Sequence, residues 1–464
     1  MRHMRTQNGS ASPEAIHAIQ GHFGDRLLTL PTHRAEYGKS ECHFEPVLPD
    51  AVLRAQSVDD VVQLVKFANE YRFSLIPYGA GTSVEGNTIP IHGGVTIDLS
   101  GLDRIIAVNS SDLDCVVEPG VRREDLNLHL RDQGLFFPID PGANATIGGM
   151  ASTRASGTNA VRYGTMRDCV LGLKVVTADG KIVRTSRRAK KSAAGYDLTG
   201  LFVGSEGTLG IVVEVNLKLF GIPETISSAV CAFETTRGAV QSVVELIQLG
   251  VPVARAEILD DLQIQAVNKW SKLEFAEKPT LFFEFHGSPA SVAEQIEIVS
   301  GISKANGGTE FRWAERLEDR NVLWKARHDA YYATVNLRPG AVGWATDVCV
   351  PIGSLAQCID ETQADLRTCP VPATILGHVG DGNFHVVFSI DPRSDSEMNI
   401  VEAVNKRLIA RAIALDGTCT GEHGIGIGKK KALEDELGCA VDIMRRIKSA
   451  IDPLGIFNTG KIFS

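Results

Sequence analysis

Three histidines in the C-terminal half of the sequence stand in glycine-rich segments close to carboxylates. His378 and His385 lie seven residues apart in GHVGDGNFH, and Glu422 precedes His423 in GEHG. Two imidazoles and one carboxylate are a common ligand set for a divalent metal such as zinc or manganese, and they leave coordination positions for water or substrate. A single histidine is more often structural. Because three of the twelve histidines fall in these segments, we favour a metal site, with His423 left for proton transfer.

The first of three glycine-rich segments in the N-terminal half, PYGAGTSVEG, follows a predicted buried strand at 73–77. Its unhindered backbone N–H groups and hydroxyls suit a pyrophosphate. The residues of this predicted nest are Pro77, Gly79, Ala80, Gly81, Thr82, Ser83, Val84 and Gly86. Val84 stands where the fingerprint GxGxxG has its third glycine, and no Lys-Ser or Lys-Thr pair closes the segment. A nicotinamide Rossmann site and a P-loop are therefore disfavoured.

Two more segments of this kind follow, PGANATIGGM at 141–150 and GSEGTLGI at 204–211. Backbone with so few large side chains lets a flat ring system approach closely, and we expect the N–H groups of Gly148 and Gly149 to donate to its heteroatoms. Three such loops in one region argue against a role as plain turns. A further run, GIGIGKKK at 424–431, lacks the Ser or Thr of a phosphate loop, and we interpret its lysines as a solvated helix start.

Composition narrows the class of protein. The 464 residues are 44% hydrophobic and 22% charged, as in a folded protein of two or three domains. The net charge of -9 disfavours nucleic acid as a partner. Nine cysteines without a CxxC pair argue against a disulfide framework or a cysteine-ligated zinc. We find neither a transmembrane run nor an apolar signal core, which predicts a cytoplasmic protein, with peripheral membrane association as the alternative.

Hydrophobic periodicity predicts an α+β chain. We expect strands at 73–77, 95–99, 104–108, 115–118, 171–177, 211–219, 279–286 and 344–351. We expect helices near 61–68 and at 125–131, 239–249, 291–305, 317–334, 353–366, 399–415 and 432–451. The expected domains are an N-terminal arm (1–45), a nucleotide-sized domain (46–222), an antiparallel-sheet domain (223–415) and a C-terminal segment (416–464) that returns to the first domain.

In their order and spacing, the three N-terminal glycine segments resemble the FAD-binding domain of the vanillyl-alcohol-oxidase flavoproteins, which is of the PCMH type. The resemblance implies that the first loop holds the FAD pyrophosphate and that Ile211 meets the flavin ring. It also implies that the flavin is bordered by Thr146, Gly149, Met150, Thr153 and Gly157, and that FAD is bound further by Pro141, Glu206, Gly207 and Asn458. Some relatives tether FAD through a histidine near the first loop. Ser83, Val84 and Glu85 offer none, and we expect non-covalent FAD.

The GHVGDGNFH and GEHG motifs, with DVCVP at 347–351 and NTGK at 458–461, resemble the FAD-linked D-2-hydroxyacid dehydrogenases over nearly the whole chain. The resemblance implies a PCMH-type FAD domain of two subdomains and an α+β antiparallel-sheet substrate (cap) domain. It also implies that the C-terminal helices return to the FAD domain.

The same resemblance implies roles for the histidines and arginines. A metal on His378, His385 and Glu422 binds the substrate's α-hydroxyl and one carboxylate oxygen. His423 takes the hydroxyl proton as general base, and a hydride passes from the α-carbon to FAD. For clamping the carboxylate we favour Arg327, with Arg338 as the second candidate, because a guanidinium meets a carboxylate with two hydrogen bonds. Either arginine could instead form an ordinary surface ion pair.

The segments WKARHDA, LRPG and TD resemble the D-lactate branch of this family. The D-2-hydroxyglutarate branch has a lysine two positions before the aspartate that matches Asp347, and this chain has Ala345 there. We therefore expect oxidation of D-lactate and related D-2-hydroxy monocarboxylates to 2-keto acids. D-2-hydroxyglutarate or glycolate dehydrogenase is the alternative within the family.

Two other classes of protein stay open. A metallohydrolase could use the same ligands, but it would leave the three flavin-like loops without a task. A flavoprotein with non-redox chemistry, as in the alkylglycerone-phosphate synthases, is the other. The sequence does not choose between cytochrome c, a quinone and an electron-transfer flavoprotein as electron acceptor, and it leaves a homodimer open.

Overall fold

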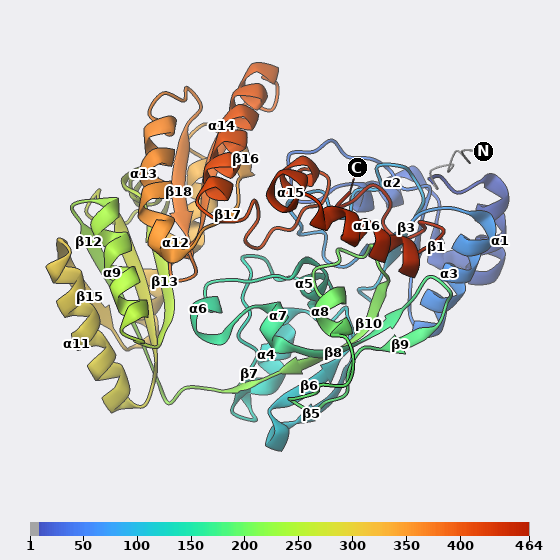
Figure 1. Cartoon of the computed structure of the whole chain (residues 1–464), viewed down its shortest axis with the longest axis horizontal. Helices are drawn as coiled ribbons and strands as arrows, with labels where there is room; N and C mark the ends of the chain where they lie inside the picture. The colour runs from blue at the N-terminus through green and yellow to red at the C-terminus, as the bar shows by residue number, and fades with distance from the viewer. Residues whose placement is uncertain (1–8, 464) are drawn as a thin grey trace. The chain divides into compact units, whose positions relative to one another are not determined.

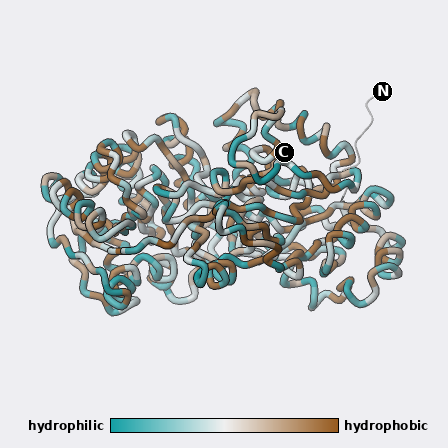
Figure 2. The backbone as a smooth tube through the Cα atoms, turned by 90° about the horizontal axis from the view of Figure 1, so that it is seen from below, coloured by the Kyte–Doolittle hydropathy of each residue, from teal (hydrophilic) through white to brown (hydrophobic). Residues whose placement is uncertain are grey.

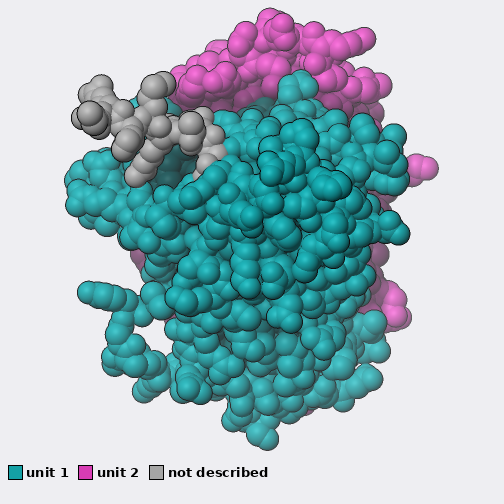
Figure 3. Space-filling model, turned by 90° about the vertical axis from the view of Figure 1, so that its right-hand side faces the viewer, with its two compact units in different colours: residues 1–155, 165–222, 422–464 teal, residues 156–164, 223–421 magenta. Residues whose placement is uncertain are grey.

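The structure is a computed structural model that describes residues 9–463. The described chain forms two compact units, coloured separately in Figure 3. Unit 1 contains residues 9–155, 165–222 and 422–463, and unit 2 contains 156–164 and 223–421. These boundaries differ from the expected ones in two places, since 156–164 belong to unit 2 and so do 416–421.

Unit 1 begins with a mixed sheet in the strand order β1-β2-β4-β3. Its strands are β1 (Leu27–Leu28), β2 (Ala51–Arg54), β3 (Leu75–Tyr78) and β4 (Val95–Asp98), and its helices are α1 (Pro13–Phe23), α2 (Pro31–Arg34) and α3 (Val58–Tyr71). Strands β2 and β3 run parallel to β4, with α3 as the crossover. Ser57 and Asp60 form a capping box that starts α3. The expected N-terminal arm is part of this layer, because Ile19 and Phe23 of α1 lie in its core.

A second, antiparallel sheet of unit 1 has the strand order β5-β6-β10-β8-β9. Its strands are β5 (Ile105–Asn109), β6 (Asp114–Val117), β8 (Val170–Val176), β9 (Ile182–Arg184) and β10 (Ile211–Lys218). The short strands β7 (Leu135–Phe136) and β11 (Phe220–Gly221) pair beside it. The connecting helices are α4 (Arg123–Arg131), α5 (Ile147–Thr153), α7 (Met166–Cys169) and α8 (Leu198–Phe202). The buried core of this layer includes Ile147 and Met150 of α5.

The C-terminal segment of unit 1 carries α15 (Lys430–Leu437) and α16 (Ala440–Ile451). A single helix over 432–451 was expected, but Gly438 has φ +52°, a left-handed conformation that ends α15. After α16 the chain lies along β3, where the Leu75 N–H donates to Ile456 O and the Asn458 N–H donates to Leu75 O. The return of this segment to the first domain agrees with the expectation.

Unit 2 is built on an antiparallel sheet in the order β15-β12-β14-β13-β18-β19-β16, with β17 paired to β19 (Figure 1). Its strands are β12 (Thr225–Phe233), β13 (Val253–Leu259), β14 (Thr280–Gly287), β15 (Gly308–Ala314), β16 (Val342–Ala345), β17 (Val348–Cys349), β18 (Ala373–Gly377) and β19 (Asn383–Ile390). Its helices are α6 (Ala160–Tyr163), α9 (Thr236–Gln248), α10 (Asp261–Ser271), α11 (Pro289–Ala305), α12 (Leu317–Val335), α13 (Leu355–Leu366) and α14 (Asp395–Ala414).

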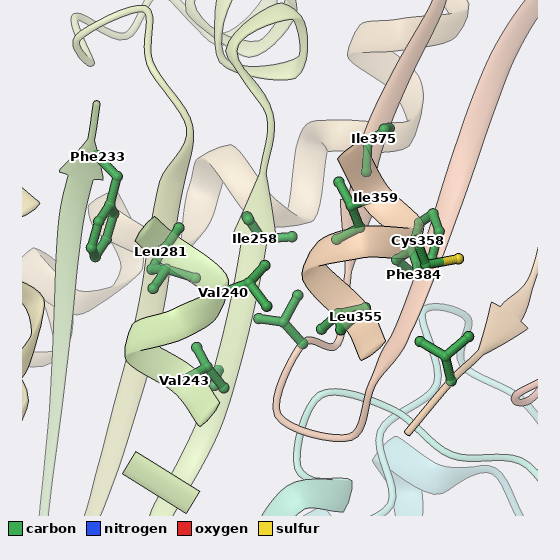
Figure 4. Packing of buried hydrophobic residues seen from close by; sticks show 14 of the residues in the cluster. Phe233, Val240, Val243, Ile258, Leu281, Leu355, Cys358, Ile359, Ile375 and Phe384 are labelled. Atoms are coloured by element: carbon green, nitrogen blue, oxygen red, sulfur yellow. The ribbon is translucent and has the colours of Figure 1, made fainter. Parts of the chain in front are cut away.

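One face of this sheet is apolar and packs on α9, α11, α13 and α14. Figure 4 shows Phe233, Ile258, Leu281 and Phe384 of the strands against residues of α9 and α13. Because side chains alternate along a strand, the neighbours of Ile258 in β13, Glu257 and Leu259, point to the other face, which α10 and α12 cover. The second face carries a smaller apolar cluster, which includes Leu259, and Glu257 is a buried polar side chain on that face.

The expected strand at 344–351 is divided into β16 and β17, and both pair with β19. In unit 2 the periodicity missed β12, β13, β15, β18, β19 and α10. Strands buried on both faces, such as β19, do not show a clean alternation. Among the described residues, no helix combines the length and the apolar composition of a membrane span. In Figure 2 the apolar stretches of the backbone are short and alternate with polar ones.

Candidate active site

The GHVGDGNFH motif forms the turn of a β-hairpin. Strand β18 ends at Gly377, His378 begins the turn, and His385 lies in β19. Leu376 pairs with His385, so the hairpin brings the two imidazoles together with ring centroids 5.5 Å apart and an interplanar angle of 84°. Both side chains are buried, with 7% and 5% exposed. The expectation that this segment folds two imidazoles toward one point is confirmed for this pair.

Each of the two rings is held by its Nδ1 atom. His385 Nδ1 lies 2.9 Å from the carbonyl oxygen of Thr346, which only accepts hydrogen bonds, so this nitrogen carries the proton. His378 Nδ1 lies 2.7 Å from Oε1 of Glu257. In this tautomer Nε2 is the atom with the lone pair, and it is the atom that would bind a metal. The donor set of the pair therefore fits a divalent metal.

Glu257 also binds the candidate carboxylate clamp. Its second oxygen, Oε2, accepts from Nε of Arg327, which lies in α12, at 2.7 Å. Burial of Glu257 opposes ionisation, but its contacts with the His378 ring and with the Arg327 guanidinium outweigh burial and hold the pKa of this carboxyl below its usual value. Within the described residues, Glu257 is the hydrogen-bond partner of Arg327, and it uses only Nε. The two terminal nitrogens of Arg327 are suited to receive an anion.

Asp347, of the DVCVP motif, supports the same hairpin. It is fully buried and accepts from Asn383 Nδ2 and from Thr420 Oγ1, both at 2.8 Å, while His385 Nδ1 lies 3.7 Å away. A Cβ at Gly421 would lie only 2.3 Å from Asn383 Nδ2. The first residue of GEHG is therefore packed against the start of β19. Glu422 and His423 follow Gly421 directly and begin the segment that belongs to unit 1.

Arg338 has structural partners. Its two terminal nitrogens bind the carboxylate of Glu397 at 2.9 and 2.6 Å, and one of them also donates to the carbonyl oxygen of Ser389. This is the ion pair that the sequence left open as its other role. Ala345 ends β16 and pairs with Val387 of β19.

The first glycine loop of unit 1 has the chemistry of an anion nest. The N–H groups of residues 79–84 donate to no backbone or side-chain acceptor within the described chain. The hydroxyl of Ser83 is buried without a hydrogen-bond partner among the described residues. Gly81 has φ +70°, which favours glycine. An unpaired buried hydroxyl beside a run of unpaired backbone N–H groups calls for a ligand, so the loop fits the pyrophosphate of FAD.

The three glycine loops of unit 1 pack on one another. A Cβ at Gly79 would lie 2.2 Å from Thr146 Oγ1 of the second loop, and a Cβ at Gly207 would lie 2.9 Å from Pro77. One expectation is wrong: the Gly148 N–H donates to the carbonyl oxygen of Pro119, so it is not available to a flavin. The Gly149 N–H, in the first turn of α5, donates to no acceptor in the described part of the chain.

Glu206 and Asn458 hold unit 1 together around these loops. The buried Glu206 carboxylate accepts from the N–H groups of Ile425 and Gly426 at 2.7 and 2.8 Å and from Asn87 Nδ2 at 2.5 Å. Asn458 Nδ2 donates to the backbone oxygens of Asn87 and Glu206. Burial raises the pKa of Glu206. These two side chains position the third loop and the start of the C-terminal segment.

The remaining expected FAD residues have diverse environments. Ile211 and Met150 are buried in the apolar cores of unit 1, and the Thr153 hydroxyl donates to Gly149 O. Pro141 is half-buried in the second loop, and Gly157 lies in the segment 156–164 of unit 2. The side chains of Ile211 and Met150 thus serve the core.

The lysines of GIGIGKKK were interpreted as solvated, and for Lys429 this is wrong. Its side chain is 3% exposed, and its ammonium group lies 3.1 Å from the Glu85 carboxylate of the first loop. Gly426 also packs against Glu85, because a Cβ at Gly426 would overlap the backbone oxygen of Glu85. The next residue, Ile427, donates its N–H to the same oxygen. The segment therefore packs against the end of the first loop within unit 1.

Sequence reasoning missed Glu257, which joins His378 to Arg327. The signal was present in the segment VARAEIL, where charged residues alternate with apolar ones: Arg255 and Glu257 fall on the same face of β13. A second polar group on that sheet was also missed. There the Tyr163 hydroxyl lies 2.7 Å from His286 Nδ1, and His286 Nε2 lies 2.9 Å from Glu284.

Comparison with known proteins agrees with this architecture. Residues 49–186 match the family described as FAD binding domain, and residues 222–462 match the C-terminal domain of FAD linked oxidases. A solved 4-ethylphenol oxidase from Gulosibacter chungangensis has the same fold, with a TM-score of 0.79 over 99% of both chains at 19% identity. The expected PCMH-type FAD fold is confirmed.

Two curated relatives are similar over nearly the whole chain. The "Probable D-lactate dehydrogenase, mitochondrial" of Danio rerio is 50% identical over 98% of this chain and 93% of its own. The "D-lactate dehydrogenase (cytochrome), mitochondrial" of Arabidopsis thaliana is 44% identical over 97% of this chain and 80% of its own. With two matching family models and relatives of this similarity, the chain belongs to the FAD-linked oxidases and is an FAD-dependent oxidoreductase.

Proposed function

We propose that this protein oxidises D-lactate, and related D-2-hydroxy monocarboxylates, to pyruvate and the corresponding 2-keto acids, with FAD as hydride acceptor. One observation carries the proposal: the two oxygens of Glu257 bind His378 and Arg327 at 2.7 Å each. A candidate metal ligand and a candidate carboxylate clamp are thereby adjacent. A 2-hydroxy acid carries its hydroxyl and its carboxylate on adjacent carbons, so a metal ligand and a carboxylate clamp held by one side chain suit these two groups.

We propose His378, His385 and Glu422 as ligands of a divalent metal, zinc or manganese. A metal at these residues, when bound, supplies Lewis acidity that lowers the pKa of a substrate hydroxyl. The Nδ1 hydrogen bonds of the two histidines support the proposal because they present Nε2 as the ligand atom. The position of Glu422 in the sequence supports its role as the third ligand. It directly follows Gly421, which packs on Asn383 of the hairpin, and consecutive Cα atoms are only about 3.8 Å apart.

Arg327 is the proposed anchor of the substrate carboxylate. Glu257 holds its Nε, and the guanidinium's terminal nitrogens can donate two parallel hydrogen bonds to a carboxylate. Arg338 is less suited to this role, because its terminal nitrogens are bound to Glu397.

His423 is the proposed general base. Removal of the α-hydroxyl proton must accompany departure of the hydride from the same carbon, and a neutral imidazole suits that task near neutral pH. The neighbouring Gly424, with φ +81°, gives the backbone an abrupt change of direction after His423. FAD, when bound in the loops of unit 1, supplies the two-electron acceptor.

The stereochemical preference follows from two fixed points. With hydroxyl and carboxylate both held, only one enantiomer directs its α-hydrogen toward the flavin, so L-acids bind without hydride transfer. A dicarboxylate such as D-2-hydroxyglutarate would place a second carboxylate without a cation, since Ala345 stands where that branch has lysine. Glycolate, without a second substituent, is the smaller alternative substrate.

The electron acceptor we propose is a cytochrome, because the name of the Arabidopsis thaliana relative includes one; a quinone and an electron-transfer flavoprotein are the alternatives. Both relatives are named as mitochondrial, so the cytoplasmic location stays a prediction from the sequence alone. The homodimer likewise stays a prediction.

Anaerobic titration of the FAD-loaded protein with D- and L-2-hydroxy acids, followed by flavin absorbance, tests the function. We expect D-lactate to bleach the flavin fully, D-2-hydroxyglutarate to bleach it slowly, and L-lactate to leave it oxidised. A flavin that no 2-hydroxy acid reduces would contradict the proposal and favour a non-redox flavoprotein.

A further inference from the structure

The carboxylate of Glu257 is placed by strand register. Strands β13 and β18 pair antiparallel with Ile258 opposite Gly377, so the next position in this register puts Glu257 beside His378. Helix α12 covers the same sheet face and brings Arg327 to the other oxygen. Three separate elements, β13, the β18–β19 hairpin and α12, thus converge on one side chain.

Stability alone does not account for a carboxylate at this position. Glu257 is completely buried in a central strand whose neighbours Ile258 and Leu259 are apolar. Replacing a buried ion pair by well-packed apolar residues is often neutral or stabilising, so a buried ionic group is weak evidence for a stabilising role. A carboxylate that binds two proposed active-site residues instead points to a role in function.

Each oxygen of Glu257 fixes one group. Oε1 accepts from His378 Nδ1, which sets the tautomer and the orientation of that ring, and partners of this kind typically change metal affinity 10- to 100-fold. Oε2 accepts from Arg327 Nε and leaves the other two nitrogens of the guanidinium for an anion. Because one rigid carboxylate holds both, the distance between metal ligand and carboxylate clamp is fixed.

We propose that Glu257 is a positioning residue that couples metal binding at His378 to substrate-carboxylate binding at Arg327. The inference rests on the proposed function, which names His378 as ligand and Arg327 as clamp. It adds that the two sites are built on one carboxylate, so a single substitution weakens both.

The test compares Glu257→Gln with wild type as FAD-loaded protein. A glutamine amide has one acceptor oxygen and a donor in place of the other, so it cannot accept from His378 and Arg327 together. After chelator treatment the protein is titrated with Mn²⁺ and, separately, with Zn²⁺, and bound metal is measured by elemental analysis. We expect the metal Kd to rise 10- to 100-fold and KM for D-lactate to rise together with it, while FAD content stays unchanged.

Two further variants separate the effect of Glu257 on metal binding from its effect on substrate binding. Arg327→Ala should raise KM and leave the metal Kd within about twofold, because the Glu257–His378 bond remains. At saturating metal, KM in Glu257→Gln/Arg327→Ala should be no higher than in Arg327→Ala, since Glu257 then acts on the substrate through Arg327. Independent, multiplicative effects on KM would overturn the coupling.

Glu284→Gln is the matched control. Glu284 is also a buried carboxylate of this sheet that binds a histidine, His286, and lies 3.5 Å from an arginine, Arg255. It contacts neither proposed metal ligand nor clamp, so its metal Kd should equal that of wild type. A merely structural role for Glu257 would give both variants the same unchanged metal Kd.

The outcomes distinguish this inference from the function on which it rests. Wild type that binds no metal would overturn the proposed metal site, and this inference with it. Wild type that binds metal with the same Kd as Glu257→Gln would overturn this inference alone. If Glu257→Gln does not fold, Glu257→Asp keeps the charge but shortens the side chain, and the same rise in metal Kd and KM is required of it.

Discussion

The Nδ1 atom of His385 lies 2.9 Å from the carbonyl oxygen of Thr346, the residue just before the buried Asp347. A backbone carbonyl cannot donate, so this contact fixes one tautomer of the ring and presents Nε2 on its other side. The side chain of Thr346 in turn accepts from the Val386 N–H, one residue along β19. The histidine is therefore held in orientation before any ligand binds.

His385→Ala and His378→Ala should each abolish metal binding and turnover while FAD stays bound, because the FAD loops belong to unit 1. A chelator should have the same effect on wild type. Metal content by elemental analysis and FAD content by absorbance check this. His286→Ala is the control, since His286 is a buried histidine of the same sheet held by Tyr163 and Glu284; it should keep its metal. Full activity of a metal-free sample would refute the metal site.

His423→Asn should retain FAD and bind D-lactate but reduce the flavin about 10²- to 10⁴-fold more slowly, the usual effect of removing a general base. Stopped-flow measurement of anaerobic flavin reduction separates this rate from substrate binding. A rate near that of wild type would assign the base to another residue.

Gly79→Ala should lower FAD affinity, because its Cβ would lie 2.2 Å from Thr146 Oγ1 and force the first two loops apart. Gly142→Ala, in the second loop, is the control, since a Cβ there meets no atom within 4 Å. FAD retention on desalting measures the difference. Acid or heat should release the flavin intact from wild type, because residues 83–85 contain no histidine. Flavin that stays on the denatured chain would contradict non-covalent binding.

The two arginines should behave differently. Arg327→Ala should raise KM for D-lactate at least tenfold, since a charge-assisted bidentate contact contributes more than about 1.4 kcal/mol. Arg338→Ala should leave KM unchanged and lower stability by up to about 1 kcal/mol, because it breaks the partly exposed ion pair with Glu397. Steady-state kinetics and thermal unfolding distinguish them. A lost preference between D-lactate and D-2-hydroxyglutarate in Arg338→Ala would return this residue to the substrate site.

Ala345→Lys should improve kcat/KM for D-2-hydroxyglutarate relative to D-lactate, because it restores the cation that the dicarboxylate branch carries at this position. The ratio of the two kcat/KM values, in wild type and variant, is the measurement. Ala345→Met, of similar length without the charge, is the control. An equal change in both variants would assign the effect to size.

Asp260→Asn should stabilise the protein in a pH-dependent way. Asp260 caps α10 by accepting from the Gln263 N–H, and burial raises its pKa from 3.8 to about 7. Between these values the folded chain holds the proton that the unfolded chain has lost, so wild-type stability falls as pH rises from 3.8 to about 7. Asparagine keeps the cap and cannot ionise.

The gain of Asp260→Asn over wild type should therefore be absent below pH 3.8, grow up to pH 7 and stay constant above it. One pKa unit corresponds to about 1.4 kcal/mol, so about 4 kcal/mol is its ceiling. Unfolding by denaturant at a series of pH values measures it, with Asp261→Asn as the control. A pH-independent difference would show that the carboxyl is ionised in the folded protein.

The amino-acid sequence by itself determined the local chemistry of this protein. Glycine loops and histidine motifs are short, and their residue types already specify what the backbone and side chains can bind, so the nest at 79–84 and the pair His378 and His385 were predictable. The helices with a clear apolar stripe, such as α9 and α13, were predictable for the same reason, since their signal lies within one element.

Only the tertiary structure decided which distant residues share a contact. Glu257 joins His378 and Arg327 across 121 and 70 positions of sequence, because β13 pairs with β18 in one register and α12 packs on that face. Arg338 and Arg327 carry the same side chain in neighbouring segments, yet one binds Glu397 and the other Glu257. Register and packing are properties of long-range pairing, and a shift of one residue would turn Glu257 to the apolar face, so no local pattern contains them.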